Sequence, residues 1–223
     1  MLSLISSIGK FLCTILSPPM CVSCKKKLET QTNFCCTCEH QLLPAAPTHL
    51  IINKHNKIIV HAACLYQGPI RPIILRKRYK NVSGCYILAD LIWQKTIFAT
   101  LPCDVIVPIP LHWTRFVQRG FNQAQEIAEI LAHKKNCTCE NILKRVKKTE
   151  YQSELPVDQR TANVQEAFKL QTTTQNYTNK HLVLLDDLMT TGSTLKYAAR
   201  ELLKLKPASL TILVACRAPL TPK

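Results

Sequence analysis

The sequence is poor in acidic residues, glycine and aromatic side chains. Its 223 residues hold 14 Asp and Glu against 29 Lys and Arg, for a formal net charge of +15, with only five glycines and 6% aromatics. No internal repeat or low-complexity block occurs, and 47% of the residues are hydrophobic, which is typical of a folded globular chain. The charge balance indicates an anionic partner: a nucleotide, a sugar phosphate, nucleic acid or an anionic membrane surface. For any single lysine, a solvated surface is the simpler explanation.

Long uninterrupted apolar runs are also missing. The opening residues 1–21 are partly apolar, but Lys10 interrupts them, no basic segment precedes them, and no small-residue cleavage site follows. The stretch is too short and broken to span a bilayer. We expect an amphipathic helix ended by Pro18 and Pro19, which docks on the protein or on a partner. These features predict a cytoplasmic protein.

Cysteine, in contrast, is abundant, with twelve in the chain. Cys21 and Cys24 form one Cys-x2-Cys pair, and Cys35 and Cys38 form a second pair after ten intervening residues. Cytoplasmic thiols stay reduced, and this spacing presents four sulfurs to one tetrahedral zinc ion. Four protein sulfurs leave no open position, so the zinc is expected to be structural. Cys36 could replace Cys35, and a set of buried thiols in a small hydrophobic subdomain is the alternative.

The remaining cysteines carry no metal signature. Five of them lie in apolar segments and are expected in the core: Cys13, Cys64, Cys85, Cys103 and Cys216. Cys137 and Cys139 form a Cys-x-Cys pair that is too isolated to assign to a site.

Strand-like and helix-like segments alternate along the chain. Expected strands cover 58–66, 104–110, 141–146, 181–187 and 209–216, and expected helices cover 69–81, 121–135 and 193–206, with a short helix near 156–164. This alternation predicts an α/β fold with a mostly parallel sheet flanked by helices. Ligands of such sheets bind at the carboxyl ends of the strands.

Two adjacent acids and a hydroxyl-rich loop follow the apolar strand 181–187. The loop contains Thr190, Thr191, Gly192, Ser193 and Thr194 and enters a helix at about Ser193. Backbone amides, hydroxyl groups and the positive end of a helix dipole then converge on one point, which suits a phosphate dianion. The carboxylates of Asp186 and Asp187 can accept hydrogen bonds from vicinal sugar hydroxyls and favour a nearby Mg²⁺. Together these groups predict a site for a ribose 5-phosphate.

The stretch "LVLLDDLMTTGST" resembles the phosphoribosyl pyrophosphate motif of type I phosphoribosyltransferases. A four-cysteine segment, "VPIPLH", "RGFNQA", "YQSELPVDQRTANVQEAF" and this motif, in that order, resemble the ComF (competence protein F) family. The resemblance extends from Cys21 to Arg217. It implies a type I phosphoribosyltransferase-like fold, which we divide into an N-terminal helix and zinc-binding segment over 1–45 and a phosphoribosyltransferase-like domain over 46–223.

By this resemblance, Asp186 and Asp187 bind the ribose hydroxyls in the catalytic site, and the hydroxyl-rich loop binds the 5-phosphate. Further contacts to the pyrophosphate are expected from Pro110, Leu111, Arg115 and Arg119. For Arg115, simple surface charge is an equally good explanation.

The resemblance leaves two functions open. The first is a phosphoribosyltransferase that uses phosphoribosyl pyrophosphate and Mg²⁺ with an unknown acceptor, acting in DNA uptake and natural competence. The second is a non-enzymatic factor that binds or processes single-stranded DNA and uses the phosphoribosyl site as a sensor. Competence machinery and single-stranded DNA are the expected partners, although few aromatic residues stand beside the basic stretch to stack on bases.

Overall fold

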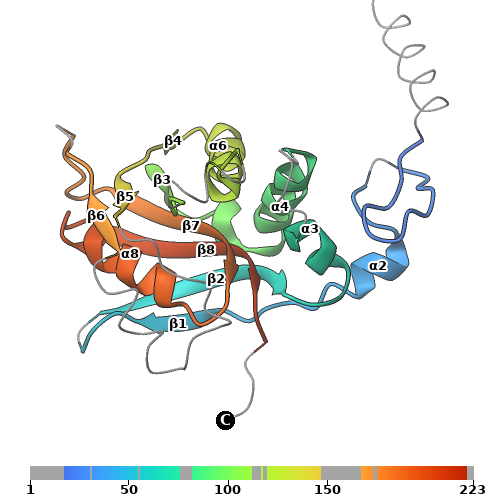
Figure 1. The fold of residues 1–223 in the computed structure, drawn as a ribbon, viewed down its shortest axis with the longest axis horizontal. Helices are drawn as coiled ribbons and strands as arrows, with labels where there is room; N and C mark the ends of the chain where they lie inside the picture. The colour runs from blue at the N-terminus through green and yellow to red at the C-terminus, as the bar shows by residue number, and fades with distance from the viewer. Residues whose placement is uncertain are drawn as a thin grey trace, which may run out of the picture.

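A six-stranded sheet forms the centre of the molecule (Figure 1). The computed structural model describes residues 18–30, 32–54, 56–75, 82–111, 117, 120–146, 167–172 and 175–219. The sheet order is β1-β2-β8-β7-β3-β4, with β1 Thr48–Ile51, β2 Lys57–Leu65, β3 Val105–Pro108, β4 Thr138–Cys139, β7 His181–Met189 and β8 Ser209–Arg217. β1 is antiparallel to β2, and the other neighbours are parallel. The predicted mostly parallel α/β sheet is confirmed.

Helices cover both faces of this sheet. The helices in the described part of the chain are α2 Cys36–His40, η1 Gly68–Ile70, α3 Arg71–Leu75, α4 Val82–Lys95, η2 Ile97–Ala99, α6 Gln123–Lys135 and α8 Ser193–Leu203. α4 and α6 pack side by side on one face, and α8 lies on the other (Figure 1). A separate two-stranded antiparallel sheet, β5 Leu143–Arg145 with β6 Phe168–Leu170, lies beside α8.

β7 shows why a strand between two helical layers is apolar on both sides. Leu182 and Leu184 belong to the buried cluster under α8, whereas Val183 and Leu185 belong to the cluster under α4 and α6. All four are at most 1% exposed. Because β7 lies between two layers of helices, its apolar residues run without alternation on both sides of the strand.

The cysteine-rich segment lies at one end of the molecule, next to α2 (Figure 1). Its Leu28 and Phe34 belong to the same buried cluster as residues of α4 and α6. Glu39 of α2 also forms an ion pair with Lys95 at the end of α4, with 3.1 Å between Oε1 and Nζ. Apolar packing and this ion pair therefore connect the segment to the sheet domain.

Several expected elements differ from the observed ones. The expected strand 141–146 belongs to the small β5–β6 sheet and not to the central one. The basic stretch 69–81 begins as the short helices η1 and α3, and α4, β1, β4 and β6 were not predicted. The expected N-terminal helix and the short helix near 156–164 lie outside the described residues. Within the described part of the chain, no helix combines the length and hydrophobicity needed to cross a membrane.

Candidate functional site

The candidate site lies where β3 and β7 end at the same edge of the sheet. Pro108 pairs with Leu185, and the amide of Ile109 donates to the carbonyl of Leu185 at 2.9 Å. Asp186 and Asp187 follow directly in β7, which continues to Met189. The backbone amide of Asp187 donates to Oδ1 of Asp186 at 2.8 Å, and Asp187 is buried with 8% exposure.

The first cleft at this edge lies between the two acids and the start of α6. Its lining is Ile109, Leu111, Phe121, Asn122, Gln123, Ala124, Asp186 and Asp187. Asn122 fixes the geometry, because its Nδ2 donates to the carbonyl of Ile109 at 2.9 Å while its Oδ1 caps α6 by accepting from the amide of Ala124 at 3.2 Å. The end of β3 and the start of α6 are thereby held together above the carboxylates.

The hydroxyl-rich loop forms a second cleft beside the first. Asp186 and residues 188–195 line it, so Asp186 borders both clefts. The hydroxyl groups of Thr191 and Ser193 lie 3.0 Å apart, and the amide of Ser193 donates to Oγ1 of Thr191 at 3.4 Å. Gly192 is the N-cap of α8 with a φ of +79°. The predicted helix start at Ser193 is confirmed.

Two helix N-termini therefore border the clefts, one from α6 and one from α8. Each presents amides without an intrahelical acceptor, together with the positive end of its dipole. The carboxylates supply acceptors for hydroxyl groups and ligands for a divalent cation. Neighbouring anion-binding and cation-binding groups of this kind suit a phosphorylated sugar.

Some predicted contacts lie at the site and others fall elsewhere. Leu111 lines the first cleft, whereas Pro110 is not among its lining residues. Arg115 and Arg119 lie outside the described residues. Asn122 and Gln123 were not predicted as cleft residues, although "RGFNQA" contains both and an Asn before a helical pattern is a signal for an N-cap.

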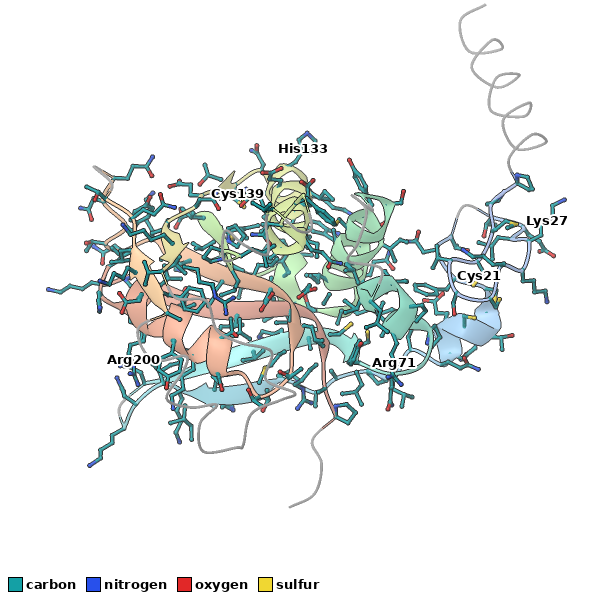
Figure 2. All side chains as sticks on the ribbon, viewed as in Figure 1. Cys21, Lys27, Arg71, His133, Cys139 and Arg200 are labelled. Carbon is teal, nitrogen blue, oxygen red and sulfur yellow. The ribbon has the colours of Figure 1, made fainter. Side chains whose placement is uncertain are left out.

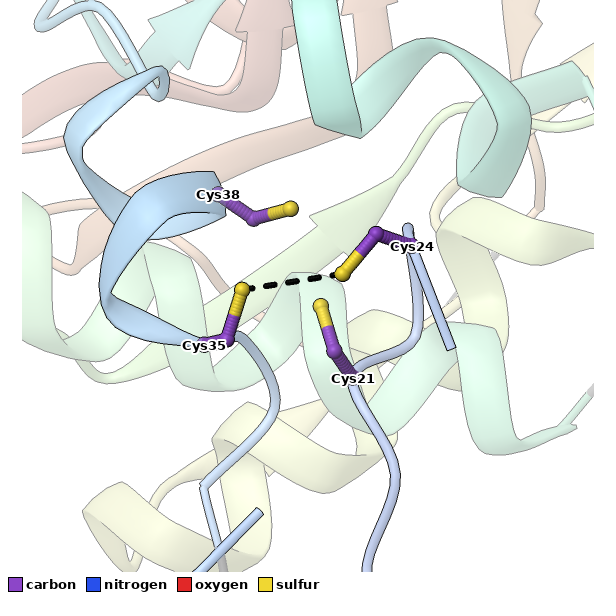
Figure 3. Close-up of side chains that lie close together, drawn as sticks. All are labelled: Cys21, Cys24, Cys35 and Cys38. Atoms are coloured by element: carbon purple, nitrogen blue, oxygen red, sulfur yellow. Dashed lines mark hydrogen bonds between the residues drawn. The ribbon is translucent and has the colours of Figure 1, made fainter. Parts of the chain in front are cut away.

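The four predicted zinc ligands meet at the N-terminal end of the molecule (Figure 3). The Sγ atoms of Cys21, Cys24, Cys35 and Cys38 all lie within 4.8 Å of one another, and those of Cys24 and Cys35 are 3.6 Å apart. Sulfurs bound tetrahedrally at 2.3 Å from zinc stand about 3.8 Å apart. Cys36 is exposed and is not part of the cluster, so the structure selects Cys35 of the two alternatives.

The local backbone and charges fit this arrangement. Lys25 has a φ of +65° in the turn after Cys24, and its amide donates to the carbonyl of Cys21 at 2.9 Å. Burial raises the pKa of the Cys21 thiol. Hydrogen bonds from backbone amides, above all that of Cys35, outweigh the effect of burial and lower this pKa to about 6. Burial and the neighbouring thiols raise the pKa of Cys38 to about 12. A dication would favour ionisation of all four thiols.

The expectation of core cysteines holds for Cys64, Cys85 and Cys216, which are at most 2% exposed. It holds only in part for Cys103, which is partly buried against the core and whose Sγ lies 3.7 Å from that of Cys137. Cys103 precedes β3 and Cys137 follows α6, so the two thiols lie where the connections between elements meet the surface. Cys13 lies outside the described residues.

Comparison with known proteins gives matches over most of the chain. A family model described as the phosphoribosyl transferase domain matches residues 116–223. Competence protein F of Haemophilus influenzae is 30% identical over 199 residues, covering 86% of this chain and 81% of that protein. The DNA utilization protein YhgH of Escherichia coli strain K12 is 28% identical over 213 residues, covering 89% and 90%. The structure of adenine phosphoribosyltransferase from Saccharomyces cerevisiae matches 77% of this chain and 83% of its own, with 13% identity and a TM-score of 0.38.

Proposed function

The chain belongs to the competence protein F family and has a type I phosphoribosyltransferase-like fold, and we propose that it binds phosphoribosyl pyrophosphate with Mg²⁺. The observation that carries this proposal is the position of Asp186, which borders both the cleft at α6 and the hydroxyl-loop cleft. A ribose bound at Asp186 can extend its 5-phosphate into the loop and its pyrophosphate toward α6.

Each group has a distinct role in this proposal. The loop from Thr190 to Thr194 holds the 5-phosphate through amides and hydroxyls, and the dipole of α8 supports it. Asp186 and Asp187 accept hydrogen bonds from the ribose hydroxyls, and oxygens at this edge would hold the cation. When bound, Mg²⁺ would neutralise part of the negative charge of the pyrophosphate. Leu111 and Asn122 shape the wall of the α6 cleft.

If transfer occurs, its chemistry concerns the anomeric carbon of the ribose. Positive charge grows there as pyrophosphate leaves, and the carboxylates of β7 favour that charge. A form that binds without transfer would act as a sensor of the same ligand.

A thermal-shift experiment with phosphoribosyl pyrophosphate and Mg²⁺ tests the proposal. A ligand at a concentration of 100 times its Kd stabilises a protein by about 2.7 kcal/mol. For a protein of this size, that raises Tm by about 5–11 °C. The double variant Asp186→Asn, Asp187→Asn should lose this shift, because the amides keep the shape but not the charge.

The matched control is Asp90→Asn, which removes a surface carboxylate paired with Lys134 at 3.0 Å on the α4–α6 face. It should keep the full ligand shift. If wild type gains no stability from the ligand, or if the double variant gains as much as wild type, the proposed site is wrong. Pyrophosphate release is then measured with nucleobases or ammonia added as acceptors, because a transferase releases pyrophosphate and a sensor does not.

We also propose that the four-cysteine cluster holds one structural Zn²⁺. Its support is the convergence of four sulfurs within 4.8 Å. The eleven cysteines among the described residues are all free thiols, which agrees with the proposed cytoplasmic location. Zinc would fix the turn after Cys24 relative to α2, and through Glu39 and Lys95 it would fix the segment on the sheet domain.

A second candidate function is direct binding of single-stranded DNA during DNA uptake. The names of the relatives and the +15 net charge favour it. Labelled basic residues lie far apart, with Lys27 on the cysteine-rich segment, Arg71 at the start of α3 and Arg200 on α8 (Figure 2). A DNA strand whose phosphates contact basic residues across such a surface would bind with an affinity that falls steeply as the salt concentration rises.

Fluorescence anisotropy with a labelled oligonucleotide at increasing salt tests this function. Each neutralised phosphate contributes a slope of about −0.7 to the plot of log K against log salt for a single strand. A slope shallower than about −2, or no binding at low salt, would contradict direct DNA binding. Repeating the titration with phosphoribosyl pyrophosphate shows whether the sugar-phosphate ligand changes the affinity for DNA.

A further inference from the structure

A cavity of about 280 Å³ lies between β2, the end of α4 and the segment that follows α2. Most of its lining residues are apolar, with Leu42, Pro44 and Leu91 among them, and the two lining residues with other chemistry are Cys64 and Lys95. Pro44 is exposed, and the Lys95 side chain is 41% exposed, so the cavity reaches the surface. The space exceeds the volume of several water molecules.

A second thiol lies directly behind Cys64. The Sγ atoms of Cys64 and Cys216 are 3.6 Å apart, and the two residues are register partners on the neighbouring parallel strands β2 and β8. Cys64 is only 2% exposed but borders the cavity, whereas Cys216 is 0% exposed and is not among the lining residues. Neighbouring strands are about 4.8 Å apart, which lies inside the 4.4–6.8 Å range of Cα separations that disulfides span.

We propose that Cys64 and Cys216 form a peroxide-reactive dithiol, with Cys64 as the attacking thiol at the cavity and Cys216 as the resolving thiol behind it. The Cys64 sulfur attacks one oxygen of hydrogen peroxide, the O–O bond breaks, and one water leaves after protonation, which gives a sulfenic acid. The Cys216 sulfur then attacks the Cys64 sulfur, the S–O bond breaks, and the Cys216 proton leaves with the hydroxide as a second water. Two thiols are oxidised to one disulfide while one peroxide is reduced to two waters.

The surroundings of the two sulfurs support this assignment of roles. The hydrogen bond from Cys216 lowers the pKa of Cys64, burial opposes it, and the positive charge of Lys95 lowers it further. A lower pKa gives a larger fraction of the nucleophilic thiolate. The pair Cys103 and Cys137 has a similar sulfur separation of 3.7 Å, but burial raises the pKa of both thiols.

The test treats the full-length, zinc-loaded protein with one to a few equivalents of hydrogen peroxide, blocks free thiols and maps peptides by mass spectrometry. The expected product is a peptide pair linked through Cys64 and Cys216, formed at least about tenfold faster than a Cys103–Cys137 link. If exposure alone governs oxidation, the partly exposed Cys103–Cys137 pair reacts first. That order, or the absence of a Cys64–Cys216 link, would overturn the proposal.

Variants separate the two thiol roles without relying on the disulfide. In Cys216→Ala, the Cys64 sulfenic acid has no resolving thiol and should be captured by dimedone, whereas in Cys64→Ala no adduct should form at Cys216. Lys95→Gln should slow oxidation of Cys64 by about threefold, because the neighbouring cation favours the thiolate. Glu39→Gln breaks the same ion pair but keeps the Lys95 ammonium, so Cys64 should be oxidised at least as fast in this variant as in the wild-type protein. Equal slowing in both would show that the charge of Lys95 plays no part.

Discussion

Gly192 allows the packing of the hydroxyl-rich loop to be tested quantitatively. Its φ of +79° is unfavourable for alanine, and an added Cβ would lie 2.9 Å from Cδ1 of Leu50 and 3.1 Å from Cε of Met189. The backbone penalty is about 1 kcal/mol, and overpacking adds about 1 kcal/mol, because both atoms are the ends of flexible side chains that can shift. Gly192→Ala should therefore destabilise the protein by about 2 kcal/mol.

The chain offers a control that isolates the steric part. Gly120 has a φ of +75°, but no atom of the described residues lies within 4 Å of its added Cβ. Gly120→Ala should cost only the backbone penalty, about 1 kcal/mol. For a protein of this size, that lowers Tm by about 2–4 °C. Gly192→Ala should lower Tm by about 4–8 °C in the same assay.

A double-mutant cycle identifies the atom responsible. Leu50→Val shortens the side chain whose Cδ1 meets the added methyl group, so it should relieve part of the damage in Gly192→Ala. We expect the two changes to be less than additive by about 0.5 kcal/mol in urea unfolding. Equal destabilisation by the two glycine variants, or strict additivity in the cycle, would refute the packing of the loop against β1.

Three further predictions concern other parts of the molecule. Cys38→Ser should reduce bound zinc from about one ion per chain to near zero in metal analysis, whereas Cys36→Ser should retain it; loss in both would contradict the cluster. Burial lowers the pKa of His61, so the unfolded chain binds the proton more tightly and stability falls as pH drops below about 6.5. In His61→Gln, the urea midpoint should change less between about pH 6.5 and 5 than in the wild-type protein, and an unchanged pH dependence of the midpoint would exclude His61 as its origin. Asn136 ends α6 with a φ of +57°, so Asn136→Ala should cost about 1 kcal/mol in urea unfolding while Asn136→Gly stays within about 0.5 kcal/mol; equal losses would contradict the left-handed cap.

Strong local patterns predicted the elements that form the site. Strand β7 and the start of α8 followed from an apolar run and a hydroxyl-rich loop, and both are confirmed. α4 was not predicted because its apolar residues surround most of the helix and give little periodicity, as expected for a helix with a heavily buried surface. The residues of β5 were predicted as a strand, but their partner β6 is distant in sequence, so the sheet they join could not be inferred.

The sequence by itself determined the fold class, the acidic pair, the hydroxyl-rich loop and the four-cysteine pattern, because each depends on local patterns along the chain. Tertiary structure decided which distant groups meet: Asn122 joins α6 to the end of β3, and Cys35 rather than Cys36 faces the other sulfurs. It also decided that Cys64 and Cys216, 152 positions apart, lie 3.6 Å from each other beside a cavity. Such contacts arise from strand register and helix packing, which local sequence patterns do not encode.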